Sequence, residues 1–531
     1  MSVKTINGRN LFITLLILQL LYMLYWGNAK GGFYVDEFFT FDNTHYISAS
    51  TPKRIKLYDA DFMEYNKWID MEELKGTLTV SSENALYRDS FAYNVKIMVK
   101  STYNWLLNYV EAVFFPGDVN KWSGISINVV LFILCQVFLY LISCKTSGSS
   151  RAALFACAMY GFSGLAVSMV VYVRFYMLAN LWLLIFLYIH TRMWEEKDFR
   201  KNILYEIIAV FVLYLGYLRS PLMVIMGIGV ILFFSVSLAV RKKWAQLAYY
   251  AVPIFAGGFI YAMLFTDYIK ILMDPSAAVQ GLGIGVAKAS LIKGVLSLTP
   301  SLFITRAVKL VEIINDYLFG HLYVFVLTAV LCIYGIIIGY RQKLKRAFIY
   351  IVVLGASVFY FIASACFNLG AIRYNSFLYP FIALLVADMI SDAFDRGRAG
   401  MMVTALFVIV LLGELYYTAS IPRIQNLYPE EKEQVENIKN NSGINNIVID
   451  YHFDDRVMYE CLAYGDADTK VMAMYFDEVD FTDKGNELLV WQTVNQSDEI
   501  LPYLEHAGYS YVEQIAVTHE SKVFLCKKPG I

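Results

Sequence analysis

The chain has 531 residues, of which 58% are hydrophobic and 17% are charged, and its formal net charge is −1. Soluble domains carry about 25% charged residues, so this composition excludes an ordinary soluble protein and indicates a chain surrounded mostly by lipid. The near-zero charge gives no support for a nucleic-acid partner. The seven cysteines lack the spacing of a metal site.

Apolar segments recur along the chain at lengths suited to a membrane. A helix needs about 20 mainly apolar residues to cross the hydrocarbon layer. The predicted spans are 10–26, 125–144, 152–172, 176–191, 204–218, 221–240, 246–266, 321–340, 347–366, 377–393 and 400–418. No small-residue cleavage site follows the first span, which argues against a signal peptide. We therefore predict an all-α polytopic membrane protein with about eleven transmembrane helices.

Positive charges indicate the orientation of these spans. Lys4 and Arg9 precede the first span, 241–243 follows the sixth and 341–346 follows the eighth. With eleven spans, every such cluster falls on one side, which the positive-inside rule assigns to the cytoplasm. The N-terminus is then inside, and the C-terminus is outside.

Three segments outside the membrane are long: 27–123, 267–320 and the tail, 419–531. In the first, helical spacing of apolar residues predicts interfacial helices at 59–75 and 91–115. In the tail, short alternating runs predict a small extracytoplasmic α/β domain. Its predicted helices are 429–439 and 499–506, and its predicted strands are 446–451, 470–476, 487–494 and 522–527.

Two adjacent acids, Asp36 and Glu37, follow the first span directly. Acids at this depth lose solvation and are costly unless they are used or paired. One interpretation is a general base with a neighbouring helper, or a metal ligand. The other is an acidic pair that ends a helix in the headgroup region. Position alone leaves both open.

Further motifs follow in a recognisable order. Phe114-Phe115-Pro116-Gly117 precedes the second span, Arg174-Phe175-Tyr176-Met177-Leu178 opens the fourth, and Arg373-Tyr374 with Tyr379-Pro380 lies at the tenth. Together with the acidic pair and the long outer loop, their order and sidedness resemble the C-type (GT-C) membrane glycosyltransferases. The resemblance is greatest to bacterial members grouped with protein mannosyltransferases and aminoarabinose transferases, and it covers most of residues 1–428.

The resemblance implies a GT-C-like catalytic domain over residues 1–418, in the bacterial cytoplasmic (inner) membrane. It implies inverting transfer of a hexosyl or pentosyl group from a polyprenyl-phosphate donor to a glycan, lipid or protein acceptor at the outer face. Asp36 is then the expected base that deprotonates the acceptor hydroxyl. Glu37 is expected to orient the acceptor or Asp36.

Cations at the outer helix ends are the candidates for binding the donor phosphate, because a leaving phosphate develops negative charge. Arg174, Arg219 and Arg373 occupy such positions, and arginine binds phosphate in a bidentate way. Lys100 is a further candidate. The alternative is that these side chains snorkel to the interface or pair with loop acids.

Two tyrosines, Tyr176 and Tyr374, adjoin these cations and are candidates for holding the donor. A tyrosine at this depth also serves as an interfacial anchor.

Two positions depart from the family pattern, and both lack a histidine. Lys100-Ser101-Thr102-Tyr103 stands where many relatives have His-Pro-Pro-Leu, and Arg219-Ser220-Pro221 stands where many have Thr-His-Tyr. The cofactor is left unknown: the sequence leaves a divalent cation open, although no ligand spacing indicates one. A transporter or flippase, and a polymerase or ligase for lipid-linked glycans, are the alternatives. Transporters often show repeated halves, whereas this sequence has no evident repeat.

Overall fold

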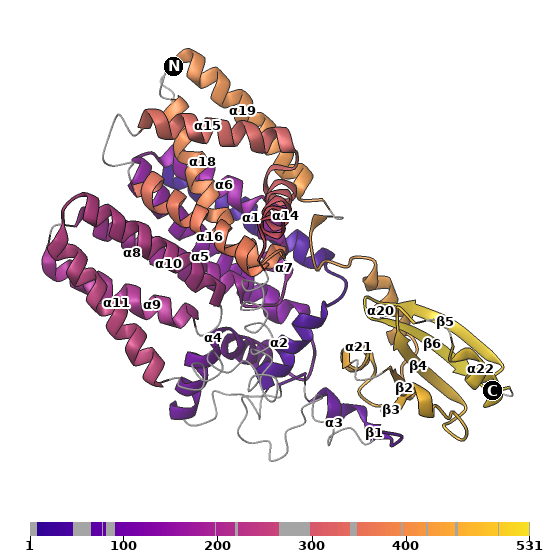
Figure 1. The fold of residues 1–531 in the computed structure, drawn as a ribbon. Helices are drawn as coiled ribbons and strands as arrows, with labels where there is room; N and C mark the ends of the chain where they lie inside the picture. Colours follow the sequence, from indigo (N-terminus) through magenta and orange to yellow (C-terminus); the bar gives the residue numbers. More distant parts are fainter. Residues whose placement is uncertain are drawn as a thin grey trace. The chain divides into compact units, whose positions relative to one another are not determined.

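The computed structural model describes residues 8–45, 65–76, 78–80, 91–196, 198–217, 221–264, 298–339, 348–394, 397–420, 423–451, 455–496 and 499–529. The chain divides into two compact units. Figure 1 draws the helices and strands of both. The first contains Met1–Met23, Val129–Val170 and Phe175–Ile424, and the second contains Leu24–Asn128, Val171–Arg174 and Gln425–Ile531.

The first unit consists of helices. They are α1 (Gly8–Ala29), α5 (Lys121–Ser147), α6 (Ser150–Gly161), α7 (Gly164–Val171), α8 (Tyr176–Glu195), α9 (Phe199–Tyr217), α10 (Pro221–Val240), α11 (Trp244–Leu264), α14 (Pro300–Ile314), η2 (Asn315–Phe319), α15 (Leu322–Gly339), η3 (Ile349–Val353), α16 (Leu354–Phe367), α17 (Ile372–Asn375), α18 (Leu378–Phe394) and α19 (Arg398–Thr418). The last turns of α1, the first turns of α5 up to Asn128, and Val171 at the end of α7 belong to the second unit. Neighbours in space include α6 with α18 and α10 with α16.

Five helices of the described residues are long and apolar enough to cross a membrane, or up to seven if two bent pairs each count as one span. The pairs are Ser150–Gly161 with Gly164–Val171, bent by 59°, and Pro300–Phe319 with Leu322–Val330, bent by 95°. Each predicted span overlaps a helix. The predicted all-α, multi-pass membrane class is thus confirmed, whereas the count of eleven stays a prediction.

The second unit contains the described helices of the first outer loop. They are α2 (Val35–His45), α3 (Met71–Lys75) and α4 (Phe91–Phe114). The predicted helix at 91–115 matches α4. The prediction for 59–75 is confirmed only over Met71–Lys75, which form α3. It is wrong over 65–70, because Asn66 has a left-handed φ of 63° and Ile69–Asp70 forms strand β1. Residues 59–64 lie outside the described ranges.

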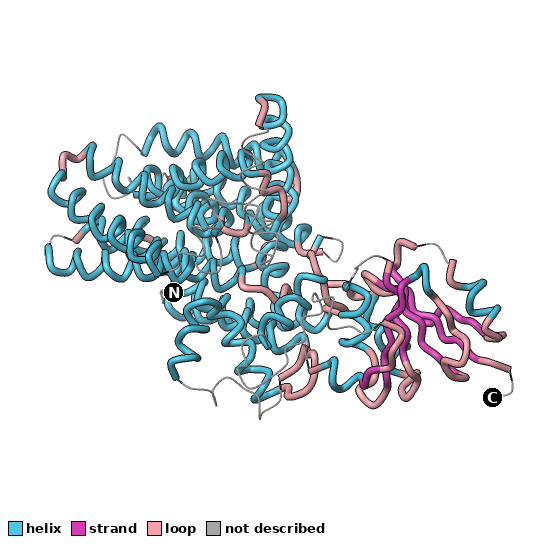
Figure 2. The backbone as a smooth tube through the Cα atoms, turned by 60° about the horizontal axis from the view of Figure 1, so that its bottom comes forward, coloured by secondary structure: helices cyan, strands magenta, loops and turns pink. Residues whose placement is uncertain are grey.

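The tail folds as an α/β domain around one sheet, drawn in magenta in Figure 2. Its strands are β2 (Asn446–Asp450), β3 (Lys470–Tyr475), β4 (Glu487–Thr493), β5 (Tyr511–Val517) and β6 (Ser521–Lys527). With β1 the sheet order is β1-β3-β2-β4-β6-β5. Strand β2 runs parallel to both β3 and β4, and the other pairs are antiparallel. The outer loop therefore supplies an edge strand to the tail.

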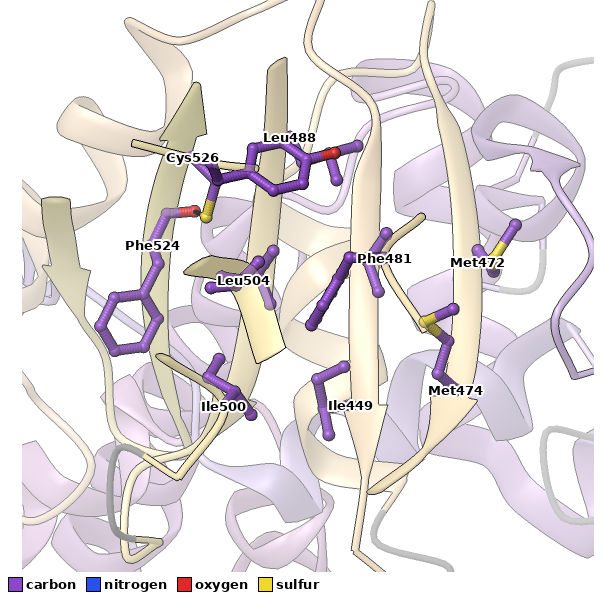
Figure 3. Close-up of a cluster of buried hydrophobic side chains, with 12 residues drawn as sticks. Ile449, Met472, Met474, Phe481, Leu488, Ile500, Leu504, Phe524 and Cys526 are labelled. Atoms are coloured by element: carbon purple, nitrogen blue, oxygen red, sulfur yellow. Dashed lines mark hydrogen bonds between the residues drawn. The ribbon is translucent and has the colours of Figure 1, made fainter. Parts of the chain in front are cut away.

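Both faces of this sheet are covered, which explains why every residue of β2 is buried. Figure 3 shows one core cluster, in which Ile449, Met474 and Leu488 of the strands meet Ile500 and Leu504. Helix α22 (Leu501–His506) lies in this core, and helices α20 (Glu431–Lys439) and α21 (Asp455–Tyr464) complete the domain. All predicted tail elements are present; α21 and β5 were not predicted.

Candidate functional site

The acidic pair lies in the first turn of α2, where the positive end of the helix dipole favours carboxylates. The two side chains differ in exposure. Asp36 is half-buried, whereas Glu37 is completely buried. The two adjacent acids therefore have different environments.

The Glu37 carboxylate is surrounded by donors. Lys30 Nζ and the Tyr34 amide donate to Glu37 Oε2 at 2.9 and 2.7 Å, and the Val173 amide donates to Oε1 at 2.6 Å. Burial raises the pKa of Glu37, while the Lys30 charge and these donors lower it in part. Glu37 thus joins the turn before α2 to residues 171–174, and its oxygens are occupied by protein groups.

Asp36 has a different environment. Tyr172 Oη donates to Asp36 Oδ2 at 2.8 Å. Arg174 Nη1 donates to the Asp36 carbonyl oxygen at 2.5 Å and to Thr40 Oγ1 at 3.0 Å. A half-buried carboxylate oriented by a hydroxyl has the chemistry of a proton acceptor.

Residues 171–174 pack against α5. The Asn128 amide donates to the Tyr172 carbonyl oxygen at 2.7 Å. A Cβ on Gly124 would lie 2.0 Å from Val173 Cγ1, so only glycine allows this close approach. The Tyr172 hydroxyl is therefore aimed at Asp36 by a packed segment.

A second group of predicted residues lies in the first unit. Arg373 and Tyr374 are in α17, and the Arg373 guanidinium carbon lies 5.1 Å from the Tyr374 ring centre. The Tyr374 ring centre is 6.5 Å from that of Tyr176, which starts α8. The Tyr360 hydroxyl donates to the Tyr374 carbonyl oxygen. The structure thus brings together Arg373, Tyr374 and Tyr176.

The remaining candidates are not placed at either group. Lys100 belongs to α4, and its side chain lies outside the description. Arg219 lies outside the described residues. Among the described residues, no three His, Cys, Asp or Glu side chains gather to hold a metal ion.

Sequence reasoning missed Lys30 and Tyr172. Tyr172 stands two residues before Arg174, which opens one of the motifs. Its closeness to that motif could have identified it as a candidate site residue. Lys30 had no such signal, because its partner Asn426 is 396 residues away along the chain. Long-range pairing of this kind is set by the tertiary fold.

The whole chain is similar in fold to solved membrane-enzyme structures. ArnT from Cupriavidus metallidurans bound to undecaprenyl phosphate has a TM-score of 0.53 and 10% identity, covering 97% of each chain. Apo ArnT from that organism has a TM-score of 0.53 and 9% identity, covering 98% of each chain. The oligosaccharyltransferase AglB from Archaeoglobus fulgidus, with an inhibitory peptide and a dolichol-phosphate, has a TM-score of 0.47 and 12% identity, covering 90% of this chain and 69% of that one. No protein-family model and no curated protein sequence matches the chain.

The chain therefore shares its fold with the ArnT structures, so the predicted resemblance to the aminoarabinose transferases is confirmed at the level of the fold. The likeness extends over the tail as well as the helices, because almost the whole of both chains is covered.

Proposed function

We propose that this protein is an inverting glycosyltransferase of the bacterial cytoplasmic membrane, with Asp36 as its general base. It moves a sugar from a polyprenyl-phosphate donor to an acceptor hydroxyl at the outer face. The observation that carries this proposal is the half-buried Asp36 carboxylate, oriented by Tyr172 Oη at 2.8 Å, in a chain with the ArnT fold. Glu37 acts as an anchor for this arrangement.

Two observations support the proposed polyprenyl-phosphate donor. ArnT, which shares the fold, was solved with undecaprenyl phosphate. In addition, Arg373 lies over the ring of Tyr374, and the Tyr374 ring neighbours that of Tyr176; rings of this kind suit an interfacial lipid headgroup. Arg373 is the proposed phosphate ligand. Arg174, Lys100 and Arg219 remain further proposals, and Nη1 of Arg174 is already used in holding α2.

Turnover of a defined donor tests the proposal. The purified full-length chain in lipid nanodiscs is incubated with a panel of undecaprenyl-phosphate sugars, and released undecaprenyl phosphate is measured with and without mixed acceptors. Acceptor-dependent release is expected for at least one sugar. If no undecaprenyl phosphate is released but labelled donor crosses the bilayer of proteoliposomes, the protein is a flippase and the glycosyltransferase proposal fails.

Arg373→Ala is expected to weaken binding of undecaprenyl phosphate about tenfold or more, because a hydrogen bond to a charged group is lost. Binding of the phospholipid to the purified variant is measured by native mass spectrometry. Arg398→Ala, which removes an exposed arginine at the start of α19, is the control and should bind as the wild type does. Unchanged affinity of Arg373→Ala would leave Arg373 as an interfacial anchor.

The first outer loop and the tail are both expected on the outer side of the membrane. Cysteines placed at the exposed positions Lys67 and Ser442 should react with an impermeant maleimide in intact cells, above the background of the native cysteines. A cysteine at exposed Arg200 should react only after lysis. Strand β1 of the outer loop pairs with β3 of the tail, so both positions should lie on the same side of the membrane. Reaction of only one of the first two would contradict the proposed topology.

A further inference from the structure

The turn between α1 and α2 is held by the tail within the second unit. The Gly31 amide donates to the Leu427 carbonyl oxygen at 2.9 Å, and the Phe33 amide donates to Tyr464 Oη at 3.1 Å. A Cβ on Gly31 would lie 2.2 Å from the Tyr428 carbonyl oxygen. The tail thus touches the turn that leads into the acidic pair.

Lys30 lies at the centre of this contact. Its side chain is fully buried, and its ammonium donates both to the Asn426 carbonyl oxygen at 2.6 Å and to Glu37 Oε2 at 2.9 Å. A buried charge is costly unless it is paired and hydrogen-bonded. The buried Lys30 ammonium therefore needs the Asn426 carbonyl oxygen of the tail in order to stay in place against Glu37.

Glu37 continues the chain of contacts toward Asp36. Its second carboxylate oxygen accepts from the Val173 amide at 2.6 Å. Val173 directly follows Tyr172, whose hydroxyl donates to Asp36. A shift of Glu37 would therefore release the segment that aims Tyr172.

We propose that Lys30 is a positioning residue, through which the tail domain fixes Glu37 and so sets the Tyr172–Asp36 hydrogen bond. This assigns the tail a part in shaping the acidic site. That the acidic site is catalytic rests on the proposed function. The hydrogen bonds that link the tail to this site do not depend on it.

Hydrogen exchange in the full-length protein tests the proposal without turnover. In Lys30→Met, the Tyr34 and Val173 amides, which donate to Glu37, should exchange about tenfold faster or more, because a charged acceptor moves away. Lys121→Met is the matched control. Among the described residues, Lys121 donates to the carbonyl oxygens of Asn28 and Lys30 and not to Glu37. Its loss should therefore loosen the turn and leave the Val173 amide unchanged.

Equal acceleration at Val173 in both variants would overturn the proposal, as would no acceleration in Lys30→Met. If Lys30→Met does not fold, Glu37→Gln tests the same link, and an unchanged Val173 amide would overturn the proposal there. Where the donor panel yields turnover, Lys30→Met should lower kcat with little change in donor KM. Failure of turnover in the wild type would count against the proposed function alone, since the exchange result does not depend on it.

Discussion

Asp36→Asn is expected to lower the transfer rate roughly 10²–10⁴-fold, which is the usual contribution of a general base. Asparagine keeps the shape of the side chain and still accepts the hydrogen bond from Tyr172, but it cannot take a proton from the acceptor hydroxyl. Donor binding should persist, because the anionic phosphate gains nothing directly from a carboxylate. Single-turnover release of undecaprenyl phosphate and native mass spectrometry measure the two effects separately.

The control is Asp118→Asn, which removes an exposed acid of the same outer loop and should retain full activity. Tyr172→Phe removes only the hydroxyl that orients Asp36, and a loss of about tenfold is expected from one charge-assisted hydrogen bond. Full activity of Asp36→Asn would end its assignment as the base and make Glu37 the next residue to test.

The second large expected effect is a loss of tail stability as the pH rises. Glu431 in α20 is buried, with 3% of its surface exposed, and Gly32 leaves room for its carboxyl group. Burial, and then the neighbouring Glu460 charge, raises the pKa of Glu431 to about 9, against 4.5 in the unfolded chain. The folded state thus holds the proton more tightly than the unfolded chain does. The stability that this group contributes is therefore complete below about pH 4.5 and is lost as the pH rises toward 9.

Across this window the free energy of unfolding should fall by up to about 1.4 kcal/mol per pH unit for one such group. Pulse proteolysis of the full-length protein at pH 6–9 measures it. Glu431→Gln should flatten the profile, and the gain over wild type should grow with pH. Glu433→Gln, at an exposed position of the same helix, should follow the wild-type profile. If Glu431→Gln follows it too, then Glu431 ionises freely in the folded protein.

Features that repeat along the sequence were predictable. The apolar spans coincide with helices because lipid requires every backbone polar group to bond within its own segment. Strands β2, β3, β4 and β6 have buried apolar runs, and each was expected near its observed bounds. Strand β5 was missed because it is a sheet edge with exposed polar residues, which removes the alternation.

The acidic site was predictable in part. The position of Asp36 after the first span identified it as a candidate, and the Arg-x-Tyr-Met-Leu motif lies next to Tyr172. The different environments of Asp36 and Glu37 were not predictable, because Glu37 depends on Lys30 and Val173, and Lys30 depends on Asn426. Residues so far apart in sequence carry no mark of their pairing.

Strand β1 makes the sheet of the tail incomplete without residues from near the start of the chain. Ile69 pairs with Val471 and Asp70 with Lys470, so about 400 residues separate the partners. During synthesis, the β1 segment must wait until nearly the whole polypeptide has been made before its partner strand exists. A tail produced as a separate fragment would leave the outer edge of β3 open to pairing with other chains, which favours aggregation. Grafting this tail onto another protein would therefore require carrying residues 69–70 with it.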